Sequence, residues 1–115
     1  MTEKTKGQIE AQISEAIIKF EKEYMGRGPK ETKTYINDDM ILVRLKGVLT
    51  PAEEQLSKSP EGADLIKKTR VQLLEGARVL LESIVIDITG FQVKSLHTDI
   101  STKTGERVIV FTLKQ

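Results

Sequence analysis

Residues 32–49 read TKTYINDDMILVRLKGVL, and this stretch decides the fold. Two apolar runs flank Asn37-Asp38-Asp39, and Asn and Asp suit a tight turn because they tolerate positive φ and hydrogen-bond to their own backbone. We therefore predict a β-hairpin over residues 33–48. Alternation gives one face the set Ile41, Val43 and Leu45. The other face would carry Met40, Leu42, Arg44 and Lys46. This face becomes polar at its far end, as expected for a sheet that is covered on one side only.

A helix is predicted before this hairpin. Thr5 and Gln8 match a capping box, in which each side chain satisfies a backbone N–H at the helix start. An apolar stripe then recurs at helical spacing, formed by Ile9, Ile13, Ile17, Phe20 and Tyr24. We expect the helix to end near Gly26, because glycine readily adopts the left-handed conformation of a helix cap.

Two helix starts follow the hairpin. In LTPAEEQL (49–56), Thr50 is a good N-cap, Pro51 suits the first helical position and Glu53 the third, so a helix of about two turns is predicted. Ser59 and the proline after it repeat the signal and open the longest helical segment. Gly90 supplies its end.

The long segment is too long for a small sheet to cover. Unbroken, it would extend about 45 Å at 1.5 Å per residue. We predict that it bends near Gly76 or packs on a second copy of the chain. Its predicted apolar face is formed by Ile66, Leu73, Ala77, Leu80, Ile84 and Ile88, widened by Leu65, Leu74, Leu81 and Val85. Arg70 and Arg78 lie beside this face, either with their heads in water or paired with acids such as Asp87 across an interface.

A second hairpin closes the chain, from FQVKSLHTDI (91–100) and RVIVFTLK (107–114), joined by a polar run that ends in Gly105. We predict one α+β domain over residues 1–115, with a four-stranded antiparallel sheet and helices packed on one face. Two helix-plus-hairpin halves, about 5–49 and 59–115, suggest a pseudo-duplication. Strand order cannot be derived from the pattern.

The composition excludes several kinds of chemistry. With 18 basic and 17 acidic side chains there is no strong field to attract nucleic acid or anionic lipid, and without cysteine there is no thiolate chemistry. His97 is the single histidine, and Asp38 and Asp39 lack the ligand spacing of a calcium loop. We expect no enzyme, no metal and no cofactor. The charged N-terminus and the lack of a long apolar run favour a soluble, cytoplasmic protein.

MGRGPK (25–30) is the candidate binding loop. Gly26 would cap the first helix, and Gly28 with Pro29 would turn the chain into the first strand. This structural explanation does not account for the arginine at position 27, Arg27, because many other side chains would allow the same cap and turn. Beside Lys30 its guanidinium could hold a carboxylate or phosphate, so we predict that the 26–33 loop is a docking site for an anionic group anchored by Arg27. Two alternatives remain open: a small RNA-binding domain, and a homo-oligomeric module that senses a ligand.

The ordered set of motifs resembles the MpsC family. It consists of GRGP (26–29), DDMILVRLKGVLTPAEEQL (38–56), an arginine in the next helix, and TGFQV (89–93) followed by GERVIVFTL (105–113). The resemblance implies a small bacterial accessory component of a membrane-embedded system for cation translocation and inorganic-carbon supply. A homodimer that docks on a membrane protein is the expected form, peripheral at the membrane through that partner. The motif residues are Gly26, Arg27, Gly28, Pro29, Asp39, Arg44, Thr50, Glu53 and Arg70.

Overall fold

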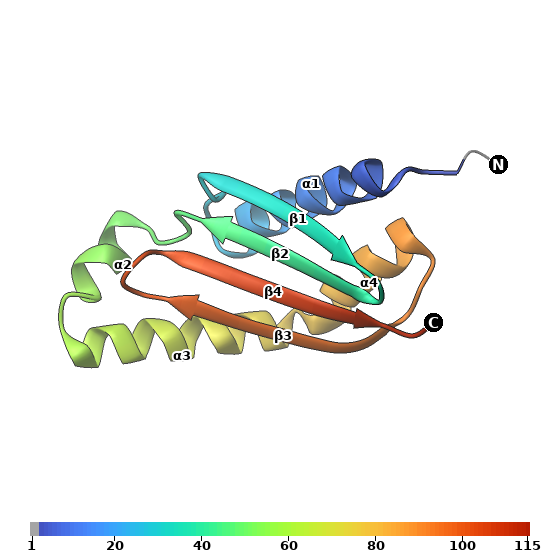
Figure 1. Ribbon diagram of the computed structural model, residues 1–115. Coiled ribbons are helices and arrows are strands. Elements are labelled where there is room, and N and C mark those ends of the chain that lie inside the picture. The colour runs from blue at the N-terminus through green and yellow to red at the C-terminus, as the bar shows by residue number, and fades with distance from the viewer. Residues whose placement is uncertain (1–2) are drawn as a thin grey trace.

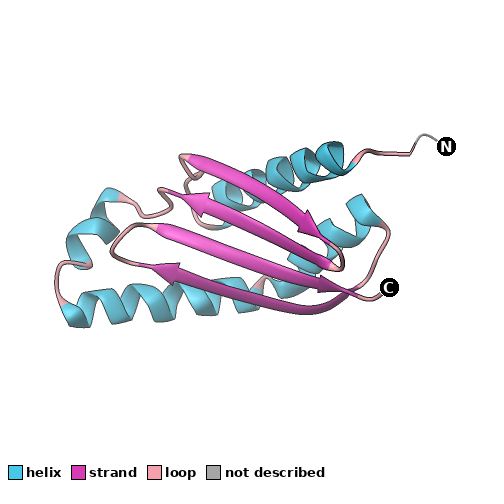
Figure 2. Cartoon of the chain, viewed as in Figure 1, coloured by secondary structure: helices cyan, strands magenta, loops and turns pink. Residues whose placement is uncertain are grey.

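The computed structural model describes residues 3–115 as four helices and four strands. In chain order they are α1 (Lys6–Tyr24), β1 (Glu31–Asn37), β2 (Met40–Lys46), α2 (Pro51–Leu56), α3 (Pro60–Gly76), α4 (Arg78–Thr89), β3 (Val93–Ser101) and β4 (Glu106–Leu113). The strands form one antiparallel sheet in the order β1-β2-β4-β3 (Figure 1). Helices α1, α3 and α4 lie behind this sheet, on one face (Figure 2). The predicted α+β class is confirmed.

Both hairpins form, and they join side by side in the middle of the sheet. The first turns tightly between Asn37 and Met40, and Asp38 has the positive φ of 54° that the turn requires. β2 then pairs with β4, from Leu45 opposite Arg107 to Met40 opposite Thr112. The two inner strands therefore come from different hairpins, while β1 and β3 form the edges.

The core lies between the sheet and the helices. The inner face of β2 contributes the predicted set Ile41, Val43 and Leu45, all fully buried. They belong to one cluster with apolar side chains of four other elements. These are Ile109, Phe111 and Leu113 of β4, Ile13, Ile17 and Phe20 of α1, Leu74 of α3, and Leu81 and Val85 of α4. Burial of this apolar surface is the main stabilising contribution to the fold.

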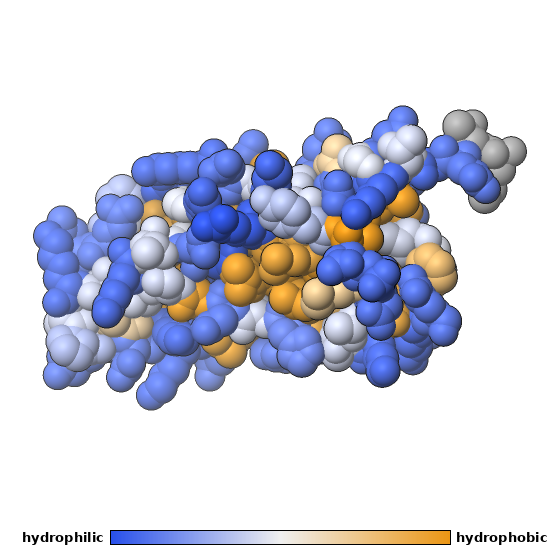
Figure 3. Space-filling view, viewed as in Figure 1, coloured by the Kyte–Doolittle hydropathy of each residue, from blue (hydrophilic) through white to orange (hydrophobic). Residues whose placement is uncertain are grey.

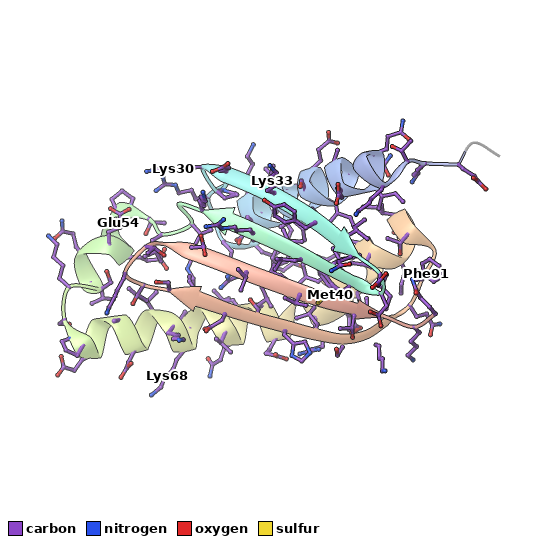
Figure 4. The ribbon with its side chains drawn as sticks, viewed as in Figure 1. Lys30, Lys33, Met40, Glu54, Lys68 and Phe91 are labelled. Atoms are coloured by element: carbon purple, nitrogen blue, oxygen red, sulfur yellow. The ribbon has the colours of Figure 1, made fainter. Side chains whose placement is uncertain are left out.

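No helix within residues 3–115 covers the outer face of the sheet (Figure 2), and the centre of this face is apolar. Tyr35, Leu42 and Val110 form one row across three strands, because Leu42 is paired with both of the others. Met40 and Val108 flank this row. The space-filling view shows the resulting apolar patch over the strands (Figure 3). Met40 lies at one end of it and Lys33 is on β1 beside it (Figure 4).

The long helical segment agrees with its predicted form in one respect and differs in another. It is interrupted at Ala77, where the backbone leaves helical geometry (φ −103°, ψ 9°), next to the Gly76 near which a bend was predicted. The predicted apolar face was partly wrong, because Leu65, Leu73 and Leu80 are exposed, at 56, 46 and 38%. Arg70, which lies on the sheet side, takes the space that a leucine stripe was expected to fill.

The helix ends carry their own hydrogen bonds. The Thr5 and Thr50 side chains each accept from the backbone N–H three residues on, within complete capping boxes, and Ser59 caps α3 in the same way. Gly90 ends α4 with a left-handed backbone. Tyr24, predicted to belong to the α1 stripe, is instead exposed and stacks on Phe20. No helix in residues 3–115 is long and apolar enough to cross a membrane.

Candidate functional site

The loop from Gly47 to Thr50 is where four of the motif residues meet, namely Arg27, Thr50, Glu53 and Arg70. It joins β2 to α2, and Val48 and Leu49 in it are buried. Arg27, in the segment between α1 and β1, donates from Nη1 to the Leu49 carbonyl at 3.1 Å. Arg70, on α3, donates from Nη2 to the Val48 carbonyl at 3.0 Å. Two arginines that are 43 positions apart in the chain therefore hold consecutive carbonyls of one loop.

Glu53 links the cap of α2 to Arg70. Its Oε1 accepts from the Thr50 backbone N–H at 2.9 Å, which completes the capping box. Both of its carboxylate oxygens also accept from Arg70, at 2.9 Å from Nε and 2.6 Å from Nη2. Burial raises the pKa of Glu53, but the hydrogen bonds from Arg70 and Thr50 outweigh it and hold the pKa below its usual value.

A second pair of opposite charges lies behind the first. Glu21 on α1 and Arg107 on β4 are each only 1% exposed, and 3.8 Å separates Glu21 Oε1 from Arg107 Nη1. Arg107 Nη2 also donates to the Arg70 carbonyl at 3.4 Å. We call Glu21, Glu53, Arg70 and Arg107 the buried ionic cluster. It joins α1, α2, α3 and β4 at one point.

The buried ionic cluster is incompletely hydrogen-bonded. Both carboxylate oxygens of Glu21 have no hydrogen-bond partner, and neither do Arg70 Nη1 or Arg107 Nε and Nη1. Burial raises the pKa of Glu21, against the opposing effects of Arg107 and Arg70. Burial likewise lowers the pKa of Arg107, against the effect of Glu21. Such a pair is costly to desolvate, and removing one member leaves the other as an uncompensated buried charge.

The chemistry available to this cluster is limited. A guanidinium is a poor proton donor, and the cluster offers no nucleophile beside the two carboxylates. Residues 3–115 contain no group of three or more His, Asp or Glu side chains that could hold a metal ion. His97 lies on the outer sheet face, exposed, with Nε2 3.0 Å from Ser95 Oγ. The arrangement can position segments of the chain, because the hydrogen bonds that it does form run between different elements.

The remaining residues of the predicted loop lie nearby at the surface. Gly26 has φ 80° after the end of α1, and a side chain at Gly28 would meet Lys22. Lys30 lines an open hollow of about 300 Å³ with Lys103, Glu54 and polar groups of the 101–105 turn. Figure 4 shows Lys30 and Glu54 at this end of the molecule. Whether Gly26, Arg27, Gly28, Pro29, Lys30 and Arg70 bind a partner stays a prediction.

Two members of the buried ionic cluster were missed by sequence reasoning, although a signal for each was present. Arg107 shares its strand face with Ile109, Phe111 and Leu113, so alternation alone places it in the core. Glu21 follows Ile17 by one helical turn on the stripe that faces the sheet. Because charged residues are rarely buried without partners, an acid and a base on two core faces predict a buried pair.

The fold and the cluster together define a small α+β protein whose motif charges hold its own loops and helices in place. Compared with known families, residues 5–115 match the family model described as "Na+-translocating membrane potential-generating system (MpsC)". The chain belongs to this MpsC family, and the resemblance inferred from its motifs is confirmed.

Two proteins of Bacillus subtilis (strain 168) are similar to this chain. "Uncharacterized protein YbcI" is 53% identical over 110 residues, covering 96% of this chain and 89% of that protein. "Uncharacterized protein YrhF" is 26% identical over 102 residues, covering 87 and 83%. No solved structure matches the chain.

Proposed function

We propose that this protein is a non-enzymatic accessory or regulatory component of a membrane potential-generating system, and that it acts by binding a membrane-embedded partner. The family description supports the system. The use of the motif charges within the buried ionic cluster supports a binding role over a catalytic one. The proposal places the chain in the cytoplasm, at the membrane only through that partner, and includes the inorganic-carbon supply that the family resemblance implies.

The uncovered sheet face is the observation that carries the proposal. The water-facing side of an antiparallel sheet normally carries polar side chains, whereas a contiguous exposed apolar patch marks a binding surface. Here the row of Tyr35, Leu42 and Val110 is apolar across three strands. We propose that this face receives an apolar segment of the membrane protein that extends out of the bilayer.

The charges beside the apolar row indicate what that segment carries. Lys33 is paired directly with Arg44, and like charges at opposite positions of a sheet repel each other. Arg44 has Glu106 as a partner at 2.8 Å, while the Lys33 ammonium lies over the Tyr35 ring at 5.7 Å. A carboxylate of the partner beside Lys33 would offset this repulsion. The proposed segment is therefore apolar with an acidic residue at one end.

Recovery of the partner from membranes tests the proposal. Tagged wild-type chain is expected to recover one membrane-embedded protein from detergent-solubilised membranes of the source cells. Tyr35→Glu is expected to abolish this recovery. Phe91→Glu is the matched control, because Phe91 is also a 42% exposed aromatic residue but lies off the sheet face. Equal recovery with both variants would remove the sheet face from the proposal.

A measurement of the membrane potential tests the system itself. Cells that lack the gene should develop a smaller sodium-dependent potential, reported by a voltage-sensitive dye, and wild-type chain should restore it where Tyr35→Glu does not. A normal potential in the deletion strain would contradict the proposed function. Binding to RNA that weakens steeply with added salt would favour the nucleic-acid alternative instead.

The proposal also takes a homodimer as the unit that binds, as the surplus apolar width of the long helical segment suggests. Its anionic docking site in the 26–33 loop keeps Arg27 and Lys30 as candidate contacts. Lys30, at the open hollow described above, is the more accessible of the two, since the Arg27 guanidinium already donates to Leu49.

A further inference from the structure

One side of α3 and α4 is exposed and uncharged over about five helical turns. Its residues recur every three or four positions across the Ala77 interruption, and all are exposed. We call them the helix strip: Leu65, Thr69, Gln72, Leu73, Gly76, Val79, Leu80 and Ser83. At 1.5 Å per residue the strip is about 27 Å long. The solvent-exposed face of a helix normally carries charged residues, and 30% of the residues in this chain are charged. An exposed face without any charge is therefore unusual for this chain.

Gly76, near the middle of the helix strip, is the last residue of α3 and lies next to the interruption at Ala77. A Cβ built on it would meet nothing within 4 Å, and its φ is not positive, so neither packing nor backbone geometry requires glycine. Glycine inside a helical segment costs about 1 kcal/mol relative to alanine. Glycine does, however, allow another backbone to approach closely. The missing side chain is explained if a second helix crosses at this point.

Two pairs of residues in the helix strip match about Gly76. Three residues before and after the glycine lie Leu73 and Val79, both branched and apolar. Seven residues before and after lie Thr69 and Ser83, both small hydroxyl residues. A two-fold axis through Gly76 would therefore bring like onto like at these two pairs, with Gln72 against Leu80 between them, from two antiparallel helices. Contact of one surface patch with its own copy is the pattern of an isologous interface.

The geometry points to a second copy of this chain as the occupant of the helix strip, in an antiparallel crossing with Gly76 against Gly76. This inference rests on the homodimer of the proposed function and names its interface. The strip is on the helix layer, whereas the proposed partner-binding face is on the outer side of the sheet. The two surfaces can therefore be occupied together.

Sedimentation equilibrium of the full chain, from about 5 to 500 μM, tests the interface. The wild type is expected to shift from the 12.9 kDa monomer to a species of twice that mass. Val79→Lys, at a residue that is 81% exposed and thus free of any folding role, should raise the dissociation constant at least tenfold. Phe91→Lys is the control and should leave it unchanged. A monomer throughout, or a dimer unaffected by Val79→Lys, would overturn the inference.

Single cysteines test the register, because the described chain has none of its own. In the antiparallel crossing Leu73 of one copy meets Val79 of the other. An equimolar mixture of the Leu73→Cys and Val79→Cys variants should therefore oxidise to a heterodimer faster than either variant alone forms a homodimer. Faster cross-linking of Leu73→Cys with itself would contradict the two-fold axis at Gly76.

The tests separate this interface from the rest of the proposed function. Val79→Lys is expected to lose the dimer but still recover the membrane protein, though less efficiently because two linked sites bind more tightly than one. Tyr35→Glu is expected to lose recovery and keep the dimer. If Tyr35→Glu lost both the dimer and the recovery of the membrane protein, while Val79→Lys kept both, the dimer interface would lie on the sheet face instead.

Discussion

Replacing Arg70 by methionine should destabilise the protein through the buried ionic cluster. The substitution keeps an unbranched side chain of similar length in the core and removes only the guanidinium. Arg70 is 3% exposed and makes two hydrogen bonds to Glu53 and one to the Val48 carbonyl. Without it, the Glu53 carboxylate loses its counter-charge and a buried carbonyl loses its donor.

The magnitude follows from the exposure of the group left behind. Removing one partner of a fully buried ion pair costs about 3–5 kcal/mol. The Glu53 side chain keeps 24% exposure and so regains water in part, which lowers the expected cost to about 2–4 kcal/mol. For a domain of this size, about 1 kcal/mol corresponds to roughly 4 °C in Tm. The Arg70→Met variant should therefore melt about 8–16 °C below the wild type.

Urea unfolding at low protein concentration measures this loss, with an unchanged m value as evidence that two-state unfolding is retained. Arg78→Met is the matched control. Arg78 forms the same two-bond fork, to Glu75, but at the surface, where an ion pair contributes little, so no measurable shift is expected. Equal effects of the two variants would refute the reasoning, because Arg70 differs from Arg78 in its burial and in its additional bond to the Val48 carbonyl, and both differences predict a larger loss for Arg70→Met.

Three further predictions concern the same region. Gly62→Ala should cost about 1–3 kcal/mol in urea unfolding, because the new Cβ would clash with the Leu56 carbonyl oxygen at the α2–α3 corner. Glu21→Gln should change the pH dependence of stability, because the folded state raises the pKa of Glu21 and so holds its proton more tightly than the unfolded state does. The free energy of unfolding of the wild type should therefore fall as pH rises from about 4.5 through the raised pKa. Urea unfolding at several pH values should show that the variant lacks this fall. Arg27→Ala should cost about 1 kcal/mol by loss of its hydrogen bond to Leu49, and a wild-type urea midpoint would show that this bond contributes nothing to stability.

The local signals in the sequence were sufficient for most of the architecture. Both hairpins followed from alternation around residues able to turn, and the positive φ of Asp38 is the physical basis of the first. The helix starts followed from side chains that satisfy orphan N–H groups. These features depend on neighbours within a few residues, so the sequence carries them directly.

The long-range features did not follow in the same way. The pairing of β2 with β4 joins segments more than 60 residues apart, and no local pattern specifies it. The rotation of α3 was also mispredicted. Leucines at 65, 73 and 80 have helical spacing and would normally be assigned to the core, whereas Arg70 is the residue that faces it. Hydropathy alone could not reveal that inversion, because an arginine is accepted in the core only where Glu53 and a free carbonyl are supplied by other elements.

This inversion connects the site to the proposed surfaces. Because α3 turns Arg70 inward to meet Glu53, its leucines at 65 and 73 are turned outward into the helix strip. Arg27 and Arg70 thus hold the 47–50 loop, and the outward leucines are left for contacts outside the chain. If the helix strip is covered by a second copy, the two outer sheet faces stay open, since they belong to the opposite layer. We therefore expect one dimer to engage two partner subunits, and a stoichiometry of one partner per dimer, measured by native mass spectrometry of the purified complex, would contradict this arrangement.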